Sequence, residues 1–297
     1  MASSILQPGQ LEAPAGEIPF LRLPARTSFF KDRAERFRQL ARDHKMGDFL
    51  AFMARIADAQ HAALQHFPPV TLPDADQLGL CRQHGMPPLP AQGWKRDPAW
   101  RQALADIVDA VSSDALQPTQ DALARLRQMD ADTLEKLADA VLSGHVQETD
   151  LGVAPFAAAA LQTYWVHMST SLGKGVFGRT DPANLCPVCA AAPVTSLVRI
   201  GPEHGLRYLH CSLCASEWHM VRTKCSNCES TKNISYYIIE GDKGAVKAEA
   251  CEECGSYLKI LYLDKDPYLE PTADDLASLA LDILMDERGV QRSGPNL

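Results

Sequence analysis

The chain has 297 residues, of which 46% are hydrophobic and 22% charged, and its 29 basic and 37 acidic residues give a net charge of −8. This composition is that of ordinary globular domains, so it argues against disordered and collagen-like chains, and the length suits one large or two modest domains. The longest apolar run, over 154–161, is far shorter than the roughly 20 residues of a membrane helix, so we expect no membrane span.

The first 28 residues are predicted to form an extended segment. No basic residue precedes Arg22, and no continuous apolar stretch follows the first methionine. Secretory and twin-arginine signals need both features. We therefore expect a cytoplasmic protein.

Residues 29–172 carry the three- and four-residue apolar spacing of amphipathic helices and predict an α-helical domain. Two helices are expected between Phe29 and Gln65, with a break near Met46-Gly47. Prolines and glycines over 67–93 exclude a long helix, so we expect turns or a short extended passage there.

Helical spacing resumes over 100–111 and 123–129. Asp132-Thr-Leu-Glu135 has the pattern of a capping box and predicts a helix that ends near Gly144. The last helix of the domain, from about Pro155 to Leu172, is apolar nearly all round, which predicts burial at the domain centre.

A glycine-containing linker is expected over 173–185, and beyond it the apolar period changes from 3.6 to 2. Short strands flanking GPEHG and GDKG predict two successive β-hairpins. A further strand is expected over 258–263. Thr272-Ala-Asp-Asp275 resembles a capping box for a final helix that ends near Arg288.

Nine cysteines are present, and eight of them form four C-x-x-C pairs within 69 residues. An odd total without an export signal argues against a disulfide framework. The pairs repeat as a unit, with one predicted hairpin inside each copy and offsets of 39 and 40 residues between copies. The paired residues are Cys186, Cys189, Cys211, Cys214, Cys225, Cys228, Cys251 and Cys254.

This spacing has a chemical reason. A C-x-x-C turn directs two sulfurs at one ion, and a hairpin brings a second such turn opposite the first, so that four thiolates enclose a tetrahedral zinc or iron. Four protein ligands leave no open position for water or substrate. We therefore predict two metal ions in closed four-cysteine sites that serve structure or electron transfer, with no catalytic residues and no metal-assisted hydrolysis.

Several alternatives stay open on spacing alone. The four C-x-x-C pairs can join as first with second and third with fourth, as an interleaved cross-brace, or as first with fourth and second with third. The repeat favours the first, tandem arrangement. Structural zinc ribbons are the plainest interpretation, and thioredoxin-like dithiols fit poorly because four pairs lie in hairpins. Cys81 is expected to be an inert thiol, and His204, His210 and His219 surface or outer-shell groups rather than ligands.

The predicted fold is therefore α+β. An N-terminal α-helical domain precedes two tandem rubredoxin-like or zinc-ribbon-like units, 186–224 and 225–263, and the C-terminal helix and tail occupy 264–297. Ribbons often bind nucleic acid, which requires a basic face. Residues 181–297 hold 11 basic and 17 acidic residues, so we expect no nucleic-acid partner.

Taken together, several motifs resemble the FdhE-type formate dehydrogenase accessory proteins. The specific matches are Cys211-Ser-Leu-Cys214-Ala-Ser-Glu-Trp-His219, Arg222 with Cys225-Ser-Asn-Cys228, Cys251-Glu-Glu-Cys254-Gly, Leu261-Tyr-Leu-Asp-Lys-Asp-Pro267 and Ala273-Asp-Asp-Leu-Ala-Ser-Leu279. Arg33-Ala-Glu-Arg36, Gly47-Asp-Phe-Leu50 and Ile56-Ala-Asp-Ala-Gln60 are similar to that family's first helices.

The resemblance implies a cytosolic, non-enzymatic maturation factor that binds the catalytic subunit of a respiratory formate dehydrogenase before export. It also favours iron in the four-cysteine sites, with zinc as the other candidate. The alternatives from other classes are a rubredoxin-like electron carrier and, third, a zinc-ribbon nucleic-acid-binding protein. Aromatic anchors favour partner contacts, so the region of Trp165, Trp218 and His219 is a candidate client face, unless these tryptophans are core.

Overall fold

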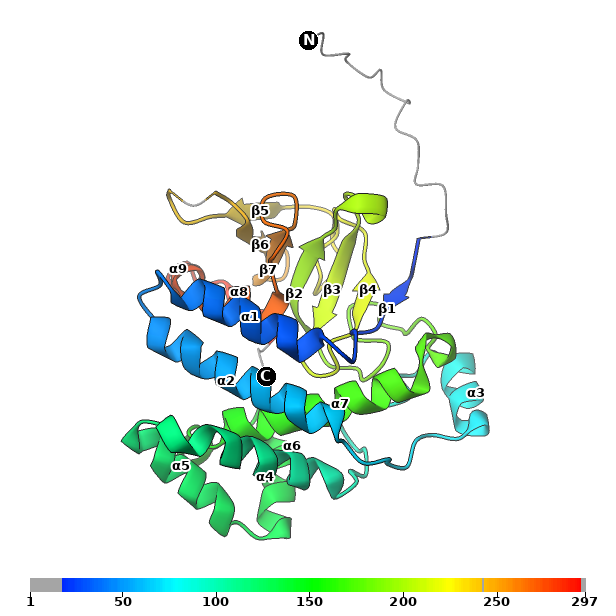
Figure 1. Ribbon diagram of the computed structural model, residues 1–297. Helices are drawn as coiled ribbons and strands as arrows, with labels where there is room; N and C mark the ends of the chain where they lie inside the picture. The colour runs from blue at the N-terminus through cyan, green and yellow to red at the C-terminus, as the bar shows by residue number, and fades with distance from the viewer. Residues whose placement is uncertain (1–17, 242, 295–297) are drawn as a thin grey trace.

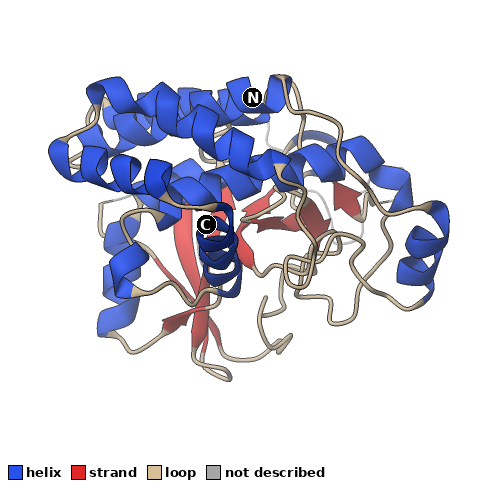
Figure 2. Cartoon of the chain, turned by 90° about the horizontal axis from the view of Figure 1, so that it is seen from below, coloured by secondary structure: helices blue, strands red, loops and turns tan. Residues whose placement is uncertain are grey.

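The structure is a computed structural model that describes residues 18–241 and 243–294. A layer of helices lies below a mixed β-sheet, and α1 runs across the boundary between them (Figure 1). Seen from below, the helices cover one side of the strands (Figure 2). The predicted α+β class is confirmed. Of the extended segment expected over 1–28, residues 1–17 lie outside the described part.

The helical layer contains seven α-helices among the described residues before the linker. The prediction of two helices broken near Met46-Gly47 is confirmed, because the second begins at Gly47. The helices are α1 (Phe29–Ala41), α2 (Gly47–Gln65), α3 (Ala75–Gln83), α4 (Ala99–Val111), α5 (Gln117–Gln128), α6 (Ala131–Ser143) and α7 (Ala154–Leu172).

Helix α7 is the centre of the helical layer, as its all-round apolar pattern predicts. Every residue from Phe156 to Ser169 is buried. Trp165 and Tyr164 are fully buried and pack with Trp100 of α4 in the largest core cluster. This core continues into the first cysteine unit, where it includes Cys186 of the turn before β2 and Leu209 of β3.

Two local predictions in this layer are wrong. The connector contains the short helix α3, which begins because Asp74 and Gln77 form a reciprocal capping box between flanking prolines. Helix α6 does not begin at Asp132. Its N-cap is Asp130, whose carboxylate accepts a hydrogen bond from the Thr133 N–H at 2.8 Å, so the helix starts two residues earlier.

The sheet has eight strands among the described residues, in the order β1-β4-β3-β2-β7-β6-β5, with β8 also pairing β7. Both predicted hairpins, β2–β3 and β5–β6, and the strand after them are confirmed. The strands are β1 (Leu21–Arg22), β2 (Pro193–Val198), β3 (Arg207–Cys211), β4 (Glu217–His219), β5 (Ile234–Tyr237), β6 (Val246–Cys251), β7 (Ser256–Tyr262) and β8 (Gln291–Arg292).

The sheet consists of two three-stranded antiparallel units, β2-β3-β4 and β5-β6-β7. They join through parallel pairing of β2 with β7, in which Thr195 lies opposite Lys259. A buried ion pair reinforces the junction, since Arg207 of β3 donates to Glu249 of β6 at 2.7 Å. The two cysteine units therefore share one continuous sheet.

The C-terminal segment differs from the single helix that the sequence predicts. The N-cap is Glu270, which accepts hydrogen bonds from the N–H groups of Thr272 and Ala273, so Thr272 already lies inside the helix. Ser278 divides the segment into α8 (Pro271–Ala277) and α9 (Leu279–Glu287). Lys259 of β7 anchors both helices through Asp275 and Asp282.

No helix in the described ranges 18–241 and 243–294 is both long and apolar enough to cross a membrane.

The first described residues contact the sheet. Strand β1 pairs with β4, with Leu21 opposite Trp218. The Tyr208 hydroxyl of β3 also donates to the Pro19 carbonyl at 2.8 Å. Residues 19–22 are thus joined to the sheet.

Candidate metal centres

Each C-x-x-C pair forms a turn at the end of a strand. In the first unit one turn precedes β2 and the other connects β3 to β4; in the second, one precedes β5 and the other connects β6 to β7. Because each hairpin folds back on itself, both turns of a unit lie at the same sheet end. The tandem grouping favoured by the repeat is the one observed: Cys186, Cys189, Cys211 and Cys214 in one cluster, Cys225, Cys228, Cys251 and Cys254 in the other.

A left-handed residue closes each turn directly after its second cysteine. The φ angles are 60° at Ala190, 57° at Ala215, 59° at Glu229 and 66° at Gly255. This conformation reverses the chain, so that the N–H of Ala190 reaches the Cys186 carbonyl at 2.8 Å. Three of these positions lack glycine and accept the cost of a left-handed backbone, which indicates that the turn geometry is required there.

The four sulfurs of the first cluster, termed the inner site, are spaced for one ion. Cys186 Sγ lies 3.5 Å from Cys214 Sγ, and Cys189 Sγ lies 3.4 and 3.7 Å from the sulfurs of Cys211 and Cys214. A tetrahedron with metal–sulfur bonds of about 2.3 Å has edges of about 3.8 Å. The observed separations therefore fit a tetrahedral thiolate site with little adjustment.

The second cluster, termed the outer site, has the same geometry. Cys225 Sγ lies 3.8 Å from Cys254 Sγ, and Cys228 Sγ lies 3.7 Å from Cys251 Sγ. Within each cluster all four sulfurs lie within 4.8 Å of one another. Both sets of donors thus suit a tetrahedral zinc or iron ion.

Burial of the inner cysteines affects how readily their thiols ionise. Burial raises the pKa of the Cys186 and Cys189 thiols well above the usual value. Burial opposes ionisation of Cys211 as well, but hydrogen bonds from the neighbouring thiols outweigh it and lower its pKa. Burial thus disfavours ionised cysteines in this cluster, and four thiolates here would require a positive ion between them.

The structure adds polar neighbours of the sulfurs that sequence reasoning missed. The Ser216 hydroxyl lies 3.2 Å from Cys214 Sγ, and the Ser256 hydroxyl lies 3.0 Å from Cys254 Sγ. Hydrogen bonds from Ser256 outweigh burial and lower the pKa of Cys254 to about 6. The signal was present in the sequence, because Cys-x-Ser recurs at the same place in both units.

The inner site is enclosed by the helical layer, and all four of its cysteines have no exposed surface. The N–H groups of Leu89 and Ala91 donate to the carbonyls of Val188 and Cys189, at 3.0 and 2.8 Å. From α7, Gln162 Nε2 donates to the Ser212 carbonyl at 2.9 Å. Both turns of the inner site are therefore held by residues outside the cysteine unit.

The outer site is more open. Cys228 is exposed and Cys254 half-buried, whereas Cys225 and Cys251 are buried. From the linker, Asn184 Nδ2 donates to the Asn227 carbonyl at 2.7 Å. The two sites share a donor set but differ in their access to solvent.

Of the two interpretations of Trp165 and Trp218, partner anchors or core residues, the structure shows the second. Trp165 is fully buried and donates to the Leu89 carbonyl, while Trp218 is 3% exposed and donates to the Ala183 carbonyl. Both are core residues, and only His219 retains partial exposure. Nor is His210 a surface residue: it is buried and stacks on Phe29.

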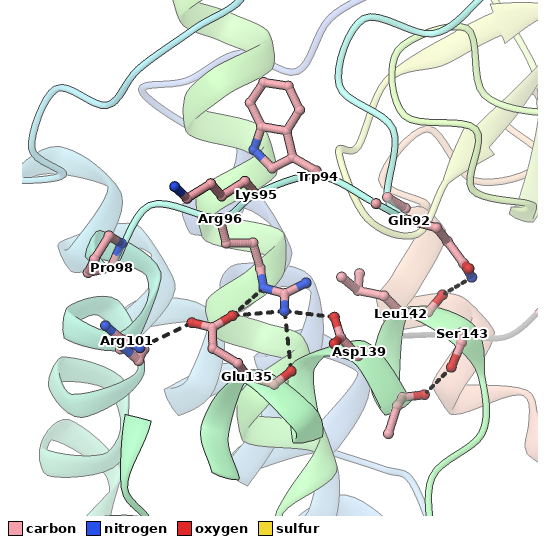
Figure 3. Close-up of a pocket in the computed structure, with 13 residues that line it drawn as sticks. Gln92, Trp94, Lys95, Arg96, Pro98, Arg101, Glu135, Asp139, Leu142 and Ser143 are labelled. Carbon is pink, nitrogen blue, oxygen red and sulfur yellow. Dashed lines mark hydrogen bonds and ion pairs between the residues drawn. The ribbon is translucent and has the colours of Figure 1, made fainter. Parts of the chain in front are cut away.

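A cavity of about 780 Å³ opens beside the segment that follows Ala91. In Figure 3, Arg96 extends between Glu135 and Asp139, and Arg101 approaches Glu135 from the other side. The Trp100 indole N–H also donates to Glu135. These ion pairs and the indole hydrogen bond fix the segment onto α6.

The fold and the two clusters define a class of protein: a helical domain joined to a duplicated, ribbon-like unit with two four-cysteine sites. Family models cover nearly all of the described chain. FdhE, N-terminal, matches residues 18–176; FdhE, central domain, matches 185–222; and FdhE, C-terminal domain, matches 223–297. The chain belongs to the FdhE family.

Curated relatives agree with this family assignment. Protein FdhE homolog of Serratia proteamaculans is 43% identical over 283 residues, covering 95% of this chain and 91% of the relative. That of Cronobacter sakazakii is 40% identical, covering 100% and 97%. The crystal structure of the FdhE protein from Pseudomonas aeruginosa matches with a TM-score of 0.86 and 39% identity, covering 94% of this chain and 98% of that one.

Proposed function

We propose that this protein is an assembly chaperone for a respiratory formate dehydrogenase, which acts in the cytoplasm and binds the catalytic subunit before export. The observation that carries the proposal is membership of the FdhE family along nearly the whole chain. The two closed four-cysteine clusters support a role without catalysis, because protein ligands fill every position of a tetrahedral site.

Deletion of the gene tests this proposal directly. We expect the deletion strain to lose membrane formate dehydrogenase activity and to regain it with a plasmid copy of the wild-type gene. Normal activity in the deletion strain would falsify the role in maturation.

We propose that all eight paired cysteines are metal ligands and that each cluster holds one ion. Iron is favoured by the family resemblance, and zinc suits the same donors. A bound ion would cross-link two turns of a unit, and iron would add a one-electron couple. Elemental mass spectrometry should find two ions per chain, and an anaerobic absorption spectrum separates coloured ferric thiolate from colourless zinc.

Iron in these sites would let client binding respond to oxygen or redox state. The measurement is client affinity with zinc, with iron in each oxidation state and under air. Identical affinity under all four conditions would exclude a redox response while leaving the chaperone role intact.

The exposed Cys228 favours one alternative, a rubredoxin-like electron carrier, because an iron bound there would lie near the surface. An electron carrier requires fast, reversible reduction of this iron. A protein that stays colourless after anaerobic preparation would count against it.

A further inference from the structure

Two surface hollows meet at Phe49, in the first turn of α2. One is a predominantly apolar groove of about 410 Å³, whose walls include Met53 and Ile56 of α2 and Ala158 of α7. The other is a hollow of about 530 Å³ at the α1–α2 turn, the end of α1 away from β1 (Figure 1). Phe49 lines both hollows and is 41% exposed. We refer to the two together as the Phe49 surface.

The groove has the features of a site for a large apolar side chain. Leu151, also on its lining, is 60% exposed, so two large apolar residues lie at the surface here without a covering element. The groove also contains buried polar groups, because Gln162 Oε1 accepts from both Arg33 and Gln60. The Thr272 hydroxyl, on the same lining, has no hydrogen-bond partner among the described residues. A ligand with an apolar body and one polar atom would fit both the apolar walls and the polar groups of this groove.

The second hollow is basic, although the whole chain carries a net charge of −8. Arg38, Arg42 and Lys45 line it, against the single carboxylate of Asp48. Arg38 is paired with Asp58. Arg42 and Lys45 are exposed and form no ion pair within the described part of the chain. Two cations therefore remain for a partner.

The start of α2 adds a third feature to the same hollow. Met46 occupies its N-cap position and supplies no side-chain hydrogen bond to the first turn. The Gly47 N–H donates to the His44 carbonyl at 2.9 Å. The N–H groups of the next residues in an uncapped first turn favour a carboxylate, and the helix dipole reinforces this preference. Arg42 and Lys45 lie in the same hollow. Apolar and anion-binding features thus lie side by side, separated by the Phe49 ring.

We propose that the Phe49 surface docks a segment of the partner protein in which apolar side chains adjoin carboxylates. The apolar part fills the groove, and the carboxylates bind Arg42, Lys45 and the start of α2. The partner is the client catalytic subunit, so this proposal rests on the proposed function. It replaces the region of Trp165 and Trp218 as the client face.

The test measures binding of the purified catalytic subunit to the full-length, metal-loaded protein by biolayer interferometry. Phe49→Ala removes the apolar anchor and Lys45→Glu reverses one charge. We expect each variant to weaken binding by about tenfold, as a central anchor or a partner-facing charge does. Matched controls are Ile283→Ala, at an apolar side chain that is 61% exposed, and Lys243→Glu, at an exposed lysine; both should change affinity less than twofold.

A second measurement identifies the occupant. Wild-type protein is probed with overlapping peptides that tile the catalytic subunit, and the bound peptides should contain apolar residues next to Asp or Glu. Their affinity should fall with added salt, and less steeply for Lys45→Glu.

Each outcome bears on a different statement. If wild type binds the catalytic subunit and neither variant weakens it, the docking surface is refuted and the chaperone role stands. If wild type does not bind at all, the proposed function fails together with this inference. A homodimer of wild type that Phe49→Ala dissociates, by analytical ultracentrifugation, would assign the surface to a second copy and refute the proposal. Decanoate that binds wild type and is lost in Phe49→Ala would assign it to a small amphiphile and would also refute it.

Discussion

The unequal burial of the two cysteine clusters leads to the sharpest prediction for this protein. The perturbation is one serine substitution in each site: Cys189→Ser in the inner site and Cys228→Ser in the outer. Cys189 is fully buried within the core that contains Trp100 and Trp165, whereas Cys228 is exposed. Each variant should lose one metal ion, but the consequences for folding should differ.

The magnitude follows from what each ion holds together. A structural tetrathiolate ion contributes about 10–16 kcal/mol to folding, which equals or exceeds the net stability of about 5–15 kcal/mol of a whole domain. The inner site lies in the main core. Cys189→Ser should therefore abolish the cooperative unfolding transition of that core. The unit with the outer site retains β2–β7 pairing and the Lys259 ion pairs, so Cys228→Ser should shift the unfolding of the main core by less than about 1 kcal/mol.

Tryptophan fluorescence separates the two responses. Three of the four tryptophans, Trp100, Trp165 and Trp218, belong to the main core, and Trp94 packs against it; none lies in the unit with the outer site. Thermal unfolding by fluorescence, with the metal content of each variant, therefore reports on the inner core alone. Equal loss of the transition in both variants, or a Cys189→Ser protein that melts like wild type, would refute this division of roles.

Three further predictions concern stability and metal release. Glu249→Ala leaves the fully buried Arg207 guanidinium without its carboxylate and should cost about 3–5 kcal/mol in urea unfolding; Glu249→Gln should cost less, and equal losses would contradict the charge argument. Burial, and next the charge of Arg26, lower the pKa of His167 to about 4. Between about pH 6.5 and 4 the histidine is therefore protonated in the unfolded chain but not in the folded one. The free energy of unfolding should be highest above pH 6.5 and should fall by about 1–2 kcal/mol as the pH is lowered to 4. His167→Gln should not show this fall. A zinc-loaded protein treated with a chelator should release the exposed outer ion before the inner one, as native mass spectrometry of time points would show; simultaneous release would contradict the difference in access.

The cysteine clusters could be predicted from sequence because their determinants are local. A C-x-x-C turn, a left-handed residue after it and a hairpin of similar length in each unit place four sulfurs together. The same holds for α7, whose all-round apolar pattern implies burial. Helix starts were less predictable, because Asp130 and Asp132 both fit an N-cap pattern and the choice between them depends on where the preceding chain runs.

Relations between distant segments lay beyond the sequence. Nothing in β2 or β7 alone indicates that they pair in parallel and merge two units into one sheet. The aromatic residues show the same limit: Trp165 and Trp218 look like partner anchors in the sequence, and the packing of α7 against the first unit buries them. Phe49 looks like one more helix residue, and only the placement of α1, α7 and α8 around α2 leaves it at the junction of two hollows.

The placement of Gln162 gives the inner site a structural connection to the Phe49 surface. Its Oε1 accepts hydrogen bonds in the groove from Gln60 and Arg33, and its Nε2 donates to the Ser212 carbonyl between Cys211 and Cys214. A metal ion bound by Cys211 and Cys214 would hold that carbonyl in place on its other side. We therefore expect metal binding at the inner site and client binding in the groove to be coupled through Gln162, which client affinity measured with and without metal would check; equal affinity in the two states would contradict the coupling.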